Sequence, residues 1–102
     1  MAKVTAFTLD GYELVFYPKD HEPEHFHLFR LVHSWEIKVL FMLCTNSHLE
    51  IRRKRPSWWA INYNPLPKNK TKILLGLISE HREALKAQWD ELQGGERQTE
   101  DE

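Results

Sequence analysis

The sequence predicts an α+β domain in which a mainly antiparallel sheet of five to six strands, starting with a hairpin, is packed by one long C-terminal helix. Two observations predict this class. Residues 1–63 contain short runs of alternating or β-branched side chains separated by turn residues, which is typical of strands. From residue 69 onward, apolar residues recur at steps of three and four, which is typical of an amphipathic helix. Strands followed by a helix favour the α+β class.

The first two strands are expected at residues 4–9 and 12–17, which are rich in β-branched and aromatic side chains. Asp10-Gly11 separates them. Asp-Gly is typical of a type I′ turn, in which both central residues take positive φ. Pro18 ends the second strand, and a polar loop follows. The stretch therefore predicts an antiparallel hairpin.

A third strand is expected to begin at His25. Because side chains alternate across a strand, His25 and His27 share one face while Phe26 and Leu28 share the other. A fourth strand is expected over residues 35–41, where apolar and polar side chains again alternate. The pattern thus predicts a pair of imidazoles on one side of the third strand.

The last part of the sheet is less regular in sequence. A fifth strand is expected over residues 48–53, and Pro56 follows it. Residues 57–63 are interpreted either as a short sixth strand or as a packed loop. Residues 64–67 contain two prolines, which remove backbone donors and restrict the residues before them.

The C-terminal helix is expected to run from residue 69 to residue 92 and to stop at Gly94-Gly95. Residues 1–93 then form a single α+β domain. Residues 94–102 are acidic and polar, and we expect them to be a disordered tail.

Composition excludes several classes of protein. Cys44 is the one cysteine, so an internal disulfide is excluded and a reducing compartment is favoured. The longest apolar run, residues 39–44, is far shorter than the roughly 20 residues of a membrane-spanning helix. The residues after Met1 do not resemble a signal peptide. We therefore expect a cytoplasmic protein without a membrane partner.

Charge is divided unevenly along the chain. The net charge is −1, yet residues 51–75 carry seven basic and no acidic side chains. One interpretation is a solvated face; the other is a surface that attracts RNA or an acidic partner protein, with a tryptophan for base stacking. The candidate nucleic-acid-binding residues are Arg52, Arg53, Lys54, Arg55, Trp58, Lys68, Lys70 and Lys72.

Three of the six histidines fall within residues 20–27, which read D-H-E-P-E-H-F-H. His25 and His27 would lie about 6–7 Å apart along a strand, close enough to share a metal ion or a proton. His21 belongs to the preceding loop. His81 lies on the apolar stripe of the helix, and it would join the pair if the helix packs on their face.

Three interpretations of these histidines stay open: structural residues, ligands of a transition metal such as zinc, or a metal-free acid–base pair. The metal-binding interpretation uses His21, His25, His27 and His81. Their orienting carboxylates would be Asp20, Glu22 and Glu24. The catalytic interpretation uses His25, His27, His81 and Arg82, with the arginine stabilising a developing phosphorane.

Two motifs resemble those of a small bacterial family of unknown function. Residues 20–28 are similar to the family's D-H-x-P-P-H-F-H-V, and residues 81–89 are similar to its H-R-x-x-L-x-x-x-W. Glu24 stands where the second proline is usual, and the segment over 47–63 is longer than in typical members. The resemblance implies an α+β domain, often encoded in toxin–antitoxin-like gene pairs, and it marks four positions: His21, His25, His27 and His81. It supplies no established activity.

The functional hypotheses belong to different classes. The first is a toxin-type RNA-cleaving or RNA-binding protein of a toxin–antitoxin-like pair. The second is a non-catalytic module that binds protein or nucleic acid and has structural histidines, and the third is a metal-binding domain without catalysis. The sequence has no Gly-rich phosphate loop, nucleophile elbow or HExxH helix. Cys44 ends an apolar strand, where a cysteine is expected to be inert. The sequence leaves open whether the protein is an enzyme and what its oligomeric state is.

Overall fold

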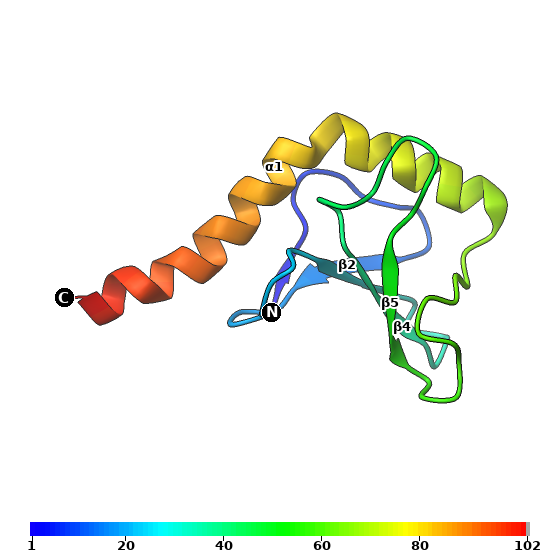
Figure 1. Ribbon diagram of the computed structural model, residues 1–102, viewed down its shortest axis with the longest axis horizontal. Helices are drawn as coiled ribbons and strands as arrows, with labels where there is room; N and C mark the ends of the chain where they lie inside the picture. Colours follow the sequence, from blue (N-terminus) through cyan, green and yellow to red (C-terminus); the bar gives the residue numbers. More distant parts are fainter. Residues whose placement is uncertain (102) are drawn as a thin grey trace.

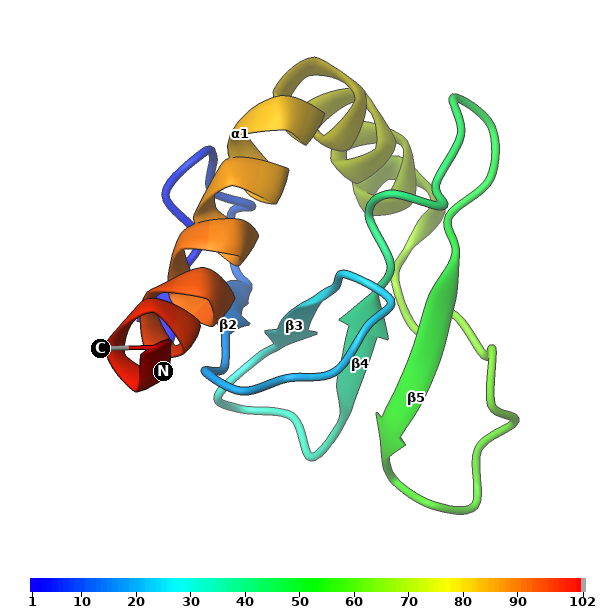
Figure 2. The ribbon, with the colours of Figure 1, turned by 60° about the vertical axis from the view of Figure 1, so that its left-hand side comes forward.

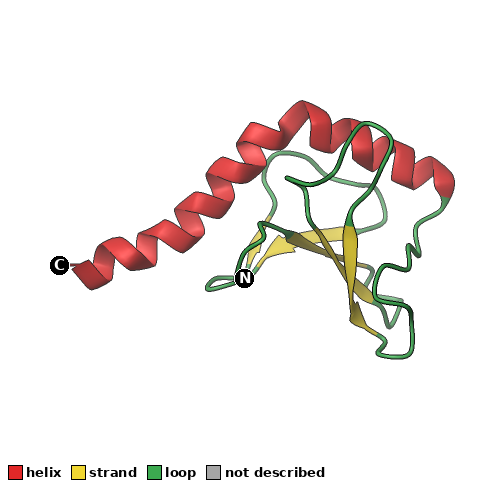
Figure 3. Cartoon of the chain, in the orientation of Figure 1, coloured by secondary structure: helices red, strands yellow, loops and turns green. Residues whose placement is uncertain are grey.

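A computed structural model describes the backbone of residues 1–101 and the side chains of residues 1–93. Within these residues one sheet has the order β1-β2-β3-β4-β5, and every neighbouring pair is antiparallel. Figure 3 shows the strands and the single long helix, α1. The predicted α+β class is confirmed. The elements are β1 (Ala2–Lys3), β2 (Glu13–Phe16), β3 (Phe26–Phe29), β4 (Glu36–Val39), β5 (Ile51–Arg55) and α1 (Lys68–Asp101).

The hydrophobic core lies between α1 and one face of the sheet (Figures 1 and 2). Phe16 is at its centre: its ring makes edge-on contacts with the rings of Phe26, Phe41 and Trp89, at centroid distances of 6.2–6.4 Å. Such edge-to-face pairs are favourable beyond the area that they bury. Because neighbours along a strand alternate, His27 of β3 lies on the face opposite to Phe26. His27 therefore lies on the face that the core does not use, whereas His25, just before β3, still contacts Trp89 of α1.

The first strand does not form over the predicted residues, because β1 (Ala2–Lys3) lies before them. A strand was expected over residues 4–9, but β1 ends at Lys3 and a loop follows. Gln88 of α1 supplies hydrogen bonds to this segment: its amide nitrogen donates to Lys3 O (2.7 Å), and its Oε1 accepts from Thr5 N (3.0 Å). The helix thus takes the place of a neighbouring strand. The loop instead sends three apolar side chains into the core: Val4, Phe7 and Leu9.

The turn at Asp10-Gly11 forms where it was predicted, but its type differs. Tyr12 N donates to Leu9 O (3.0 Å), which closes a four-residue turn. Gly11 has φ of 87°, whereas Asp10 does not have the positive φ that a type I′ turn requires. Positive φ at the third position alone is typical of a type II turn, which also favours glycine there.

The later strands follow the prediction with shifted ends. β3 and β4 lie within the expected segments, whereas β5 starts at Ile51 and extends to Arg55, directly before Pro56. Residues 56–63 form a loop, so the packed-loop interpretation holds and the sixth strand does not form. Arg53 fixes this loop: its backbone N–H donates to Ile61 O (2.6 Å), and its guanidinium donates to the carbonyl oxygens of Ser57 and Trp59.

The helix is longer than predicted. α1 runs from Lys68 to Asp101, so its backbone continues past Gly94-Gly95, where the sequence predicted an end. A glycine costs only about 1 kcal/mol in a helix interior, and this does not force a helix to end. His81 has non-helical angles (φ −115°, ψ 17°) and marks a kink. The disordered tail predicted for 94–102 falls outside the described side chains and stays a prediction. In the described chain, no helix has the apolar length that crossing a membrane requires.

Candidate functional site

The loop between β2 and β3 turns back over the start of β3 and brings a carboxylate to the histidine pair (Figure 2). Asp20 follows Lys19, whose φ of 64° reverses the chain. Asp20 Oδ2 lies 3.2 Å from His25 Nε2 and 3.1 Å from His27 Nε2. One ligand atom from each of these residues lies within 4.8 Å of the others. We call Asp20, His25 and His27 the Asp–His–His triad.

His27 lies between two carboxylates. Its side chain is 1% exposed. Its Nδ1 is 2.8 Å from Glu36 Oε2, and its Nε2 faces Asp20 on the other side of the ring. Glu36, on β4, is itself buried, and the amine of Lys54 and the guanidinium of Arg55 lie 3.6 and 3.4 Å from its carboxylate. The two cations thus hold the Glu36 carboxylate from one side, and Glu36 in turn orients the His27 ring.

A neutral His27 ring cannot satisfy both carboxylates. Burial holds the pKa of His27 below its ordinary value; the carboxylate of Asp20 opposes this, while positive charge at His25 and Lys54 adds to it. A neutral imidazole carries one proton. When that proton is donated from Nδ1 to Glu36, Nε2 presents a lone pair to Asp20 Oδ2. This contact is favourable only with a cation or an added proton between the two atoms.

The Nδ1 atom of His25 also has a hydrogen-bond partner, which is a backbone carbonyl instead of a carboxylate. Its Nδ1 is 2.8 Å from Pro23 O, and a carbonyl oxygen only accepts, so Nδ1 carries the proton. The Nε2 of the neutral ring then bears a lone pair. This atom is buried and lies 3.2 Å from Asp20 Oδ2, but it makes no hydrogen bond of proper geometry among the described residues. The ring is held against His27 and Trp89, at centroid distances of 5.1 and 5.4 Å. Its Nε2 is thus fixed in the direction of Asp20.

An open cavity of about 360 Å³ adjoins the triad. Asp20 and His25 line it, and so do the exposed His21 and two cationic side chains, Lys38 of β4 and Arg52 of β5. A ligand in this cavity would lie beside the atoms of the triad and would contact positive charge.

The structure brings together His25 and His27 but not all four predicted histidines. His21 is exposed and lines the cavity without joining the ligand atoms. His81 lies at the kink of α1, with its ring 5.7 Å from that of Phe7. The expected convergence required α1 to pack on the His25/His27 face, whereas the core between helix and sheet uses the opposite face of β3. The predicted four-histidine set is therefore not assembled.

Arg82, the predicted phosphorane-stabilising residue, makes a structural contact. Its Nη2 donates to Cys44 O (2.7 Å), and its side chain lines a different cavity along α1 with Ser79 and Lys86. The structure does not place Arg82 in the triad or among the side chains that line the adjoining cavity.

The basic residues of β5 have partners within the protein. Arg52 Nη1 lies 2.7 Å from Glu50 Oε2, and the other three contact Glu36 or the 56–63 loop, as described above. Of the lysines that begin α1 (Lys68, Lys70 and Lys72), Lys70 donates to Asp10 O (3.2 Å). Trp58 is 79% exposed and remains the most accessible aromatic side chain of the segment. A nucleic-acid contact of these residues stays a prediction.

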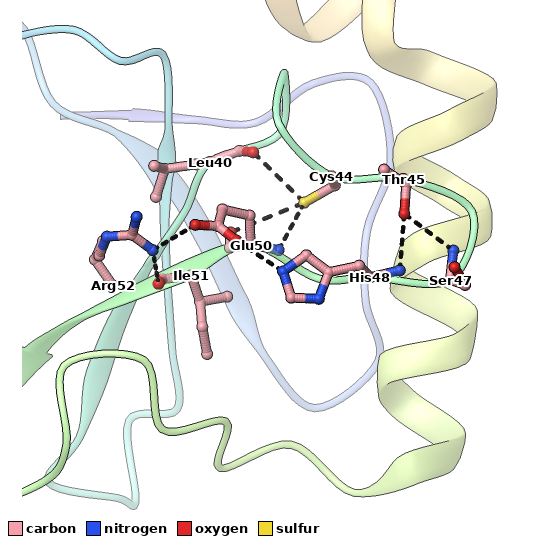
Figure 4. A network of polar contacts seen from close by, with 8 residues as sticks. All are labelled: Leu40, Cys44, Thr45, Ser47, His48, Glu50, Ile51 and Arg52. Atoms are coloured by element: carbon pink, nitrogen blue, oxygen red, sulfur yellow. Dashed lines mark hydrogen bonds and ion pairs between the residues drawn. The ribbon is translucent and has the colours of Figure 1, made fainter.

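Cys44 belongs to a network at the turn before β5 (Figure 4). Its Sγ donates to Leu40 O (3.5 Å) and accepts from Glu50 N (3.3 Å). The side chain is buried, and burial raises the pKa of the thiol. The network therefore gives Cys44 a structural role.

We expect Cys44 to react slowly with iodoacetamide in the native protein. The raised pKa leaves less thiolate at a given pH than a free cysteine has, and burial blocks access. The rate, followed by mass spectrometry at pH 8, should rise to that of a free thiol once urea unfolds the chain. Equal rates in native and unfolded protein would contradict the assigned role.

Two residues of the site were missed by the sequence interpretation. Glu36 and Lys38 were treated as the polar positions of the alternating fourth strand. Their importance depends on register: His27 pairs with Lys38, and Phe29 pairs with Glu36. A single acidic residue between the apolar Trp35 and Ile37 was the available signal, since Glu36 is buried and a buried carboxylate needs a partner.

Comparison with known proteins adds no functional assignment. No family model, curated protein or solved structure matches this chain. The resemblance to the small bacterial family stays a prediction that rests on the two motifs.

Proposed function

We propose that the protein binds one transition-metal ion, with Zn²⁺ as the first candidate, through the Asp–His–His triad. The convergence of Asp20 Oδ2, His25 Nε2 and His27 Nε2 carries this proposal. A single added proton can bridge two of these atoms, but a metal ion can bridge all three. Imidazole and carboxylate are the ligand types that suit Zn²⁺.

The separations between the ligand atoms support the proposal. Nitrogen and oxygen ligands at about 2.0–2.1 Å from a tetrahedral Zn²⁺ are about 3.3 Å from one another. The carboxylate oxygen of Asp20 lies 3.2 and 3.1 Å from the two Nε2 atoms. Asp20 therefore already lies at ligand spacing from both histidines, and all three ligand atoms lie within 4.8 Å of one another.

The contacts of the outward ring nitrogens also support a metal. Histidines that bind metal ions usually donate their other N–H to a carboxylate or a backbone carbonyl, which fixes the tautomer. Here His27 Nδ1 contacts the carboxylate of Glu36, and His25 Nδ1 contacts the backbone carbonyl of Pro23. Both rings are thereby prepared to offer Nε2.

Three protein ligands leave a position open toward the cavity. Closed four-ligand zinc sites are structural, whereas three ligands and an open position are typical of catalytic ones, where the metal activates water or polarises an oxygen. Two histidines and one carboxylate also suit Fe²⁺. Toxin-type RNA cleavage, toxin–antitoxin pairing and a cytoplasmic location remain predictions. Metal-activated water would supply a nucleophile for such cleavage without His81 or Arg82.

The test is a calorimetric titration with Zn²⁺ of protein that carries no histidine tag and has been treated with chelator. We expect one ion per chain. Glu36→Gln is expected to weaken the affinity about 10–100-fold, because the neutral amide orients and polarises His27 less well. Glu50→Gln, which alters a carboxylate paired with Arg52, is the matched control and should bind as the wild type does. No saturable binding to the wild type would refute the proposal.

A further inference from the structure

We propose that the cavity beside the metal receives a phosphoryl group, held between the metal ion, Lys38 and Arg52. This inference rests on the proposed metal site and names the ligand class that the site takes. It follows from the sheet register, from the charge of Lys38 and from the composition of the cavity.

The register places the two cations in one row with a proposed metal ligand. His27 of β3 pairs with Lys38 of β4, and Lys38 pairs with Arg52 of β5. Directly paired residues project from the same face of a sheet, and adjacent strands lie about 4.7–4.9 Å apart. Lys38 and Arg52 therefore start about 5 and 10 Å from His27, within reach of an anion bound to the metal.

The pairing of Lys38 with Arg52 is unfavourable without an anion. Like charges directly opposite each other destabilise a sheet. The charge of Arg52 is compensated by Glu50. Its contacts with Glu50 and with Ile51 O both use Nη1 (Figure 4), which leaves the Nε and Nη2 donors for a ligand. Lys38 is half-buried, and no carboxylate lies within 4 Å of its amine in the described part of the chain. It is the cation of this row that an incoming anion would pair with.

The cavity becomes positive once the metal is bound. Its charged lining consists of two carboxylates, Asp20 and Glu22, and two cations, Lys38 and Arg52, which cancel. A divalent ion then gives the site a net positive charge. The volume of about 360 Å³ lies at the small end of ligand sites, which span about 300–1,000 Å³. It suits a phosphoryl group with a small substituent.

A phosphoryl group fits this arrangement better than a carboxylate does. The metal, Lys38 and Arg52 lie along a row, so an anion that contacts all three needs oxygens in three directions. A phosphoryl group offers these, whereas a carboxylate offers two oxygens in one plane. The guanidinium also matches two phosphoryl oxygens at once.

The test uses Zn²⁺-loaded protein, titrated calorimetrically with inorganic phosphate, uridine monophosphate, a short single-stranded RNA and acetate. We expect phosphate-containing ligands to bind and acetate to bind more weakly. Lys38→Met should retain one Zn²⁺ per chain and should lose about tenfold or more in phosphate affinity, because a charge-assisted contact is removed. Lys3→Met, at an exposed position of β1 outside the proposed sites and the basic segment, is the control and should change neither affinity.

The outcomes separate the two proposals. Three results would overturn the phosphoryl assignment and leave the metal site standing, provided that Zn²⁺ binds. They are no binding of phosphate, equal affinities for phosphate and acetate, and an unchanged phosphate affinity in Lys38→Met. Failure of Zn²⁺ to bind would overturn both. If phosphate binds, the relative affinities identify its source. Equal affinities for inorganic phosphate and uridine monophosphate would indicate free phosphate as the ligand. Tighter binding of uridine monophosphate would indicate a small phosphate ester, and tighter binding of the RNA would indicate a polymer.

Discussion

Replacing His27 with asparagine is expected to abolish stoichiometric binding of Zn²⁺. The asparagine amide nitrogen takes the place of Nδ1 and can still donate to Glu36, but no atom replaces Nε2. His25→Asn is the parallel change, with the amide donating to Pro23 O. Loss of a direct ligand should cost more than the about 10–100-fold expected for Glu36→Gln. Metal content by mass spectrometry and calorimetric titration are the measurements.

The control is His48→Asn. His48 is exposed and pairs with Glu50, outside the triad, so this variant should keep one ion per chain. Circular dichroism should show the native fold in all three variants. If folded His25→Asn and His27→Asn proteins bind Zn²⁺ as the wild type does, the triad is not the metal site and its histidines are structural.

Replacing Phe16 with alanine is expected to lower the free energy of unfolding by about 3–5 kcal/mol, the usual cost of deleting a buried aromatic ring. Phe16 is fully buried and contacts three other aromatic rings, one of which, Trp89, belongs to α1. The variant removes the centre of the contact between sheet and helix. Urea denaturation, followed by circular dichroism, gives the change.

Trp58→Ala is the matched control for an aromatic deletion. Trp58 is 79% exposed, so its loss should alter the free energy of unfolding by no more than about 0.5 kcal/mol. Similar losses for the two variants would show that the aromatic cluster around Phe16 does not stabilise the fold as described.

Local patterns in the sequence were sufficient to predict the fold class. The alternation around His25 and Ile37 predicts β3 and β4, and the change of period after Pro67 predicts the helix. Both patterns arise from side chains that must be buried on one face. The first strand was misplaced, because Val4 to Leu9 has strand composition but the backbone of Thr5 bonds to the side chain of Gln88, 83 positions away in the chain. Composition contains no information about such a distant partner.

The site was predictable to the extent that its members are close in sequence. Strand alternation predicted that His25 and His27 would lie together, and their rings are 5.1 Å apart. The prediction that His81 would join them was wrong, because helical periodicity indicates that a helix packs on the sheet without indicating which face it covers. Glu36 was missed for a related reason: its contact with His27 depends on the register of β4 against β3. Such register follows from the whole core and the turn lengths.

The proposed ligands all come from one stretch of the chain, from Asp20 to His27. An unfolded chain can bring them around an ion as well, so the metal would have some affinity for the unfolded state. Only differential affinity for the native state stabilises a protein. What the fold adds is Glu36 from β4 and the exclusion of water from His27. Bound metal would therefore raise the stability of this domain by less than its affinity alone implies, and would help to organise the loop before β3 early in folding.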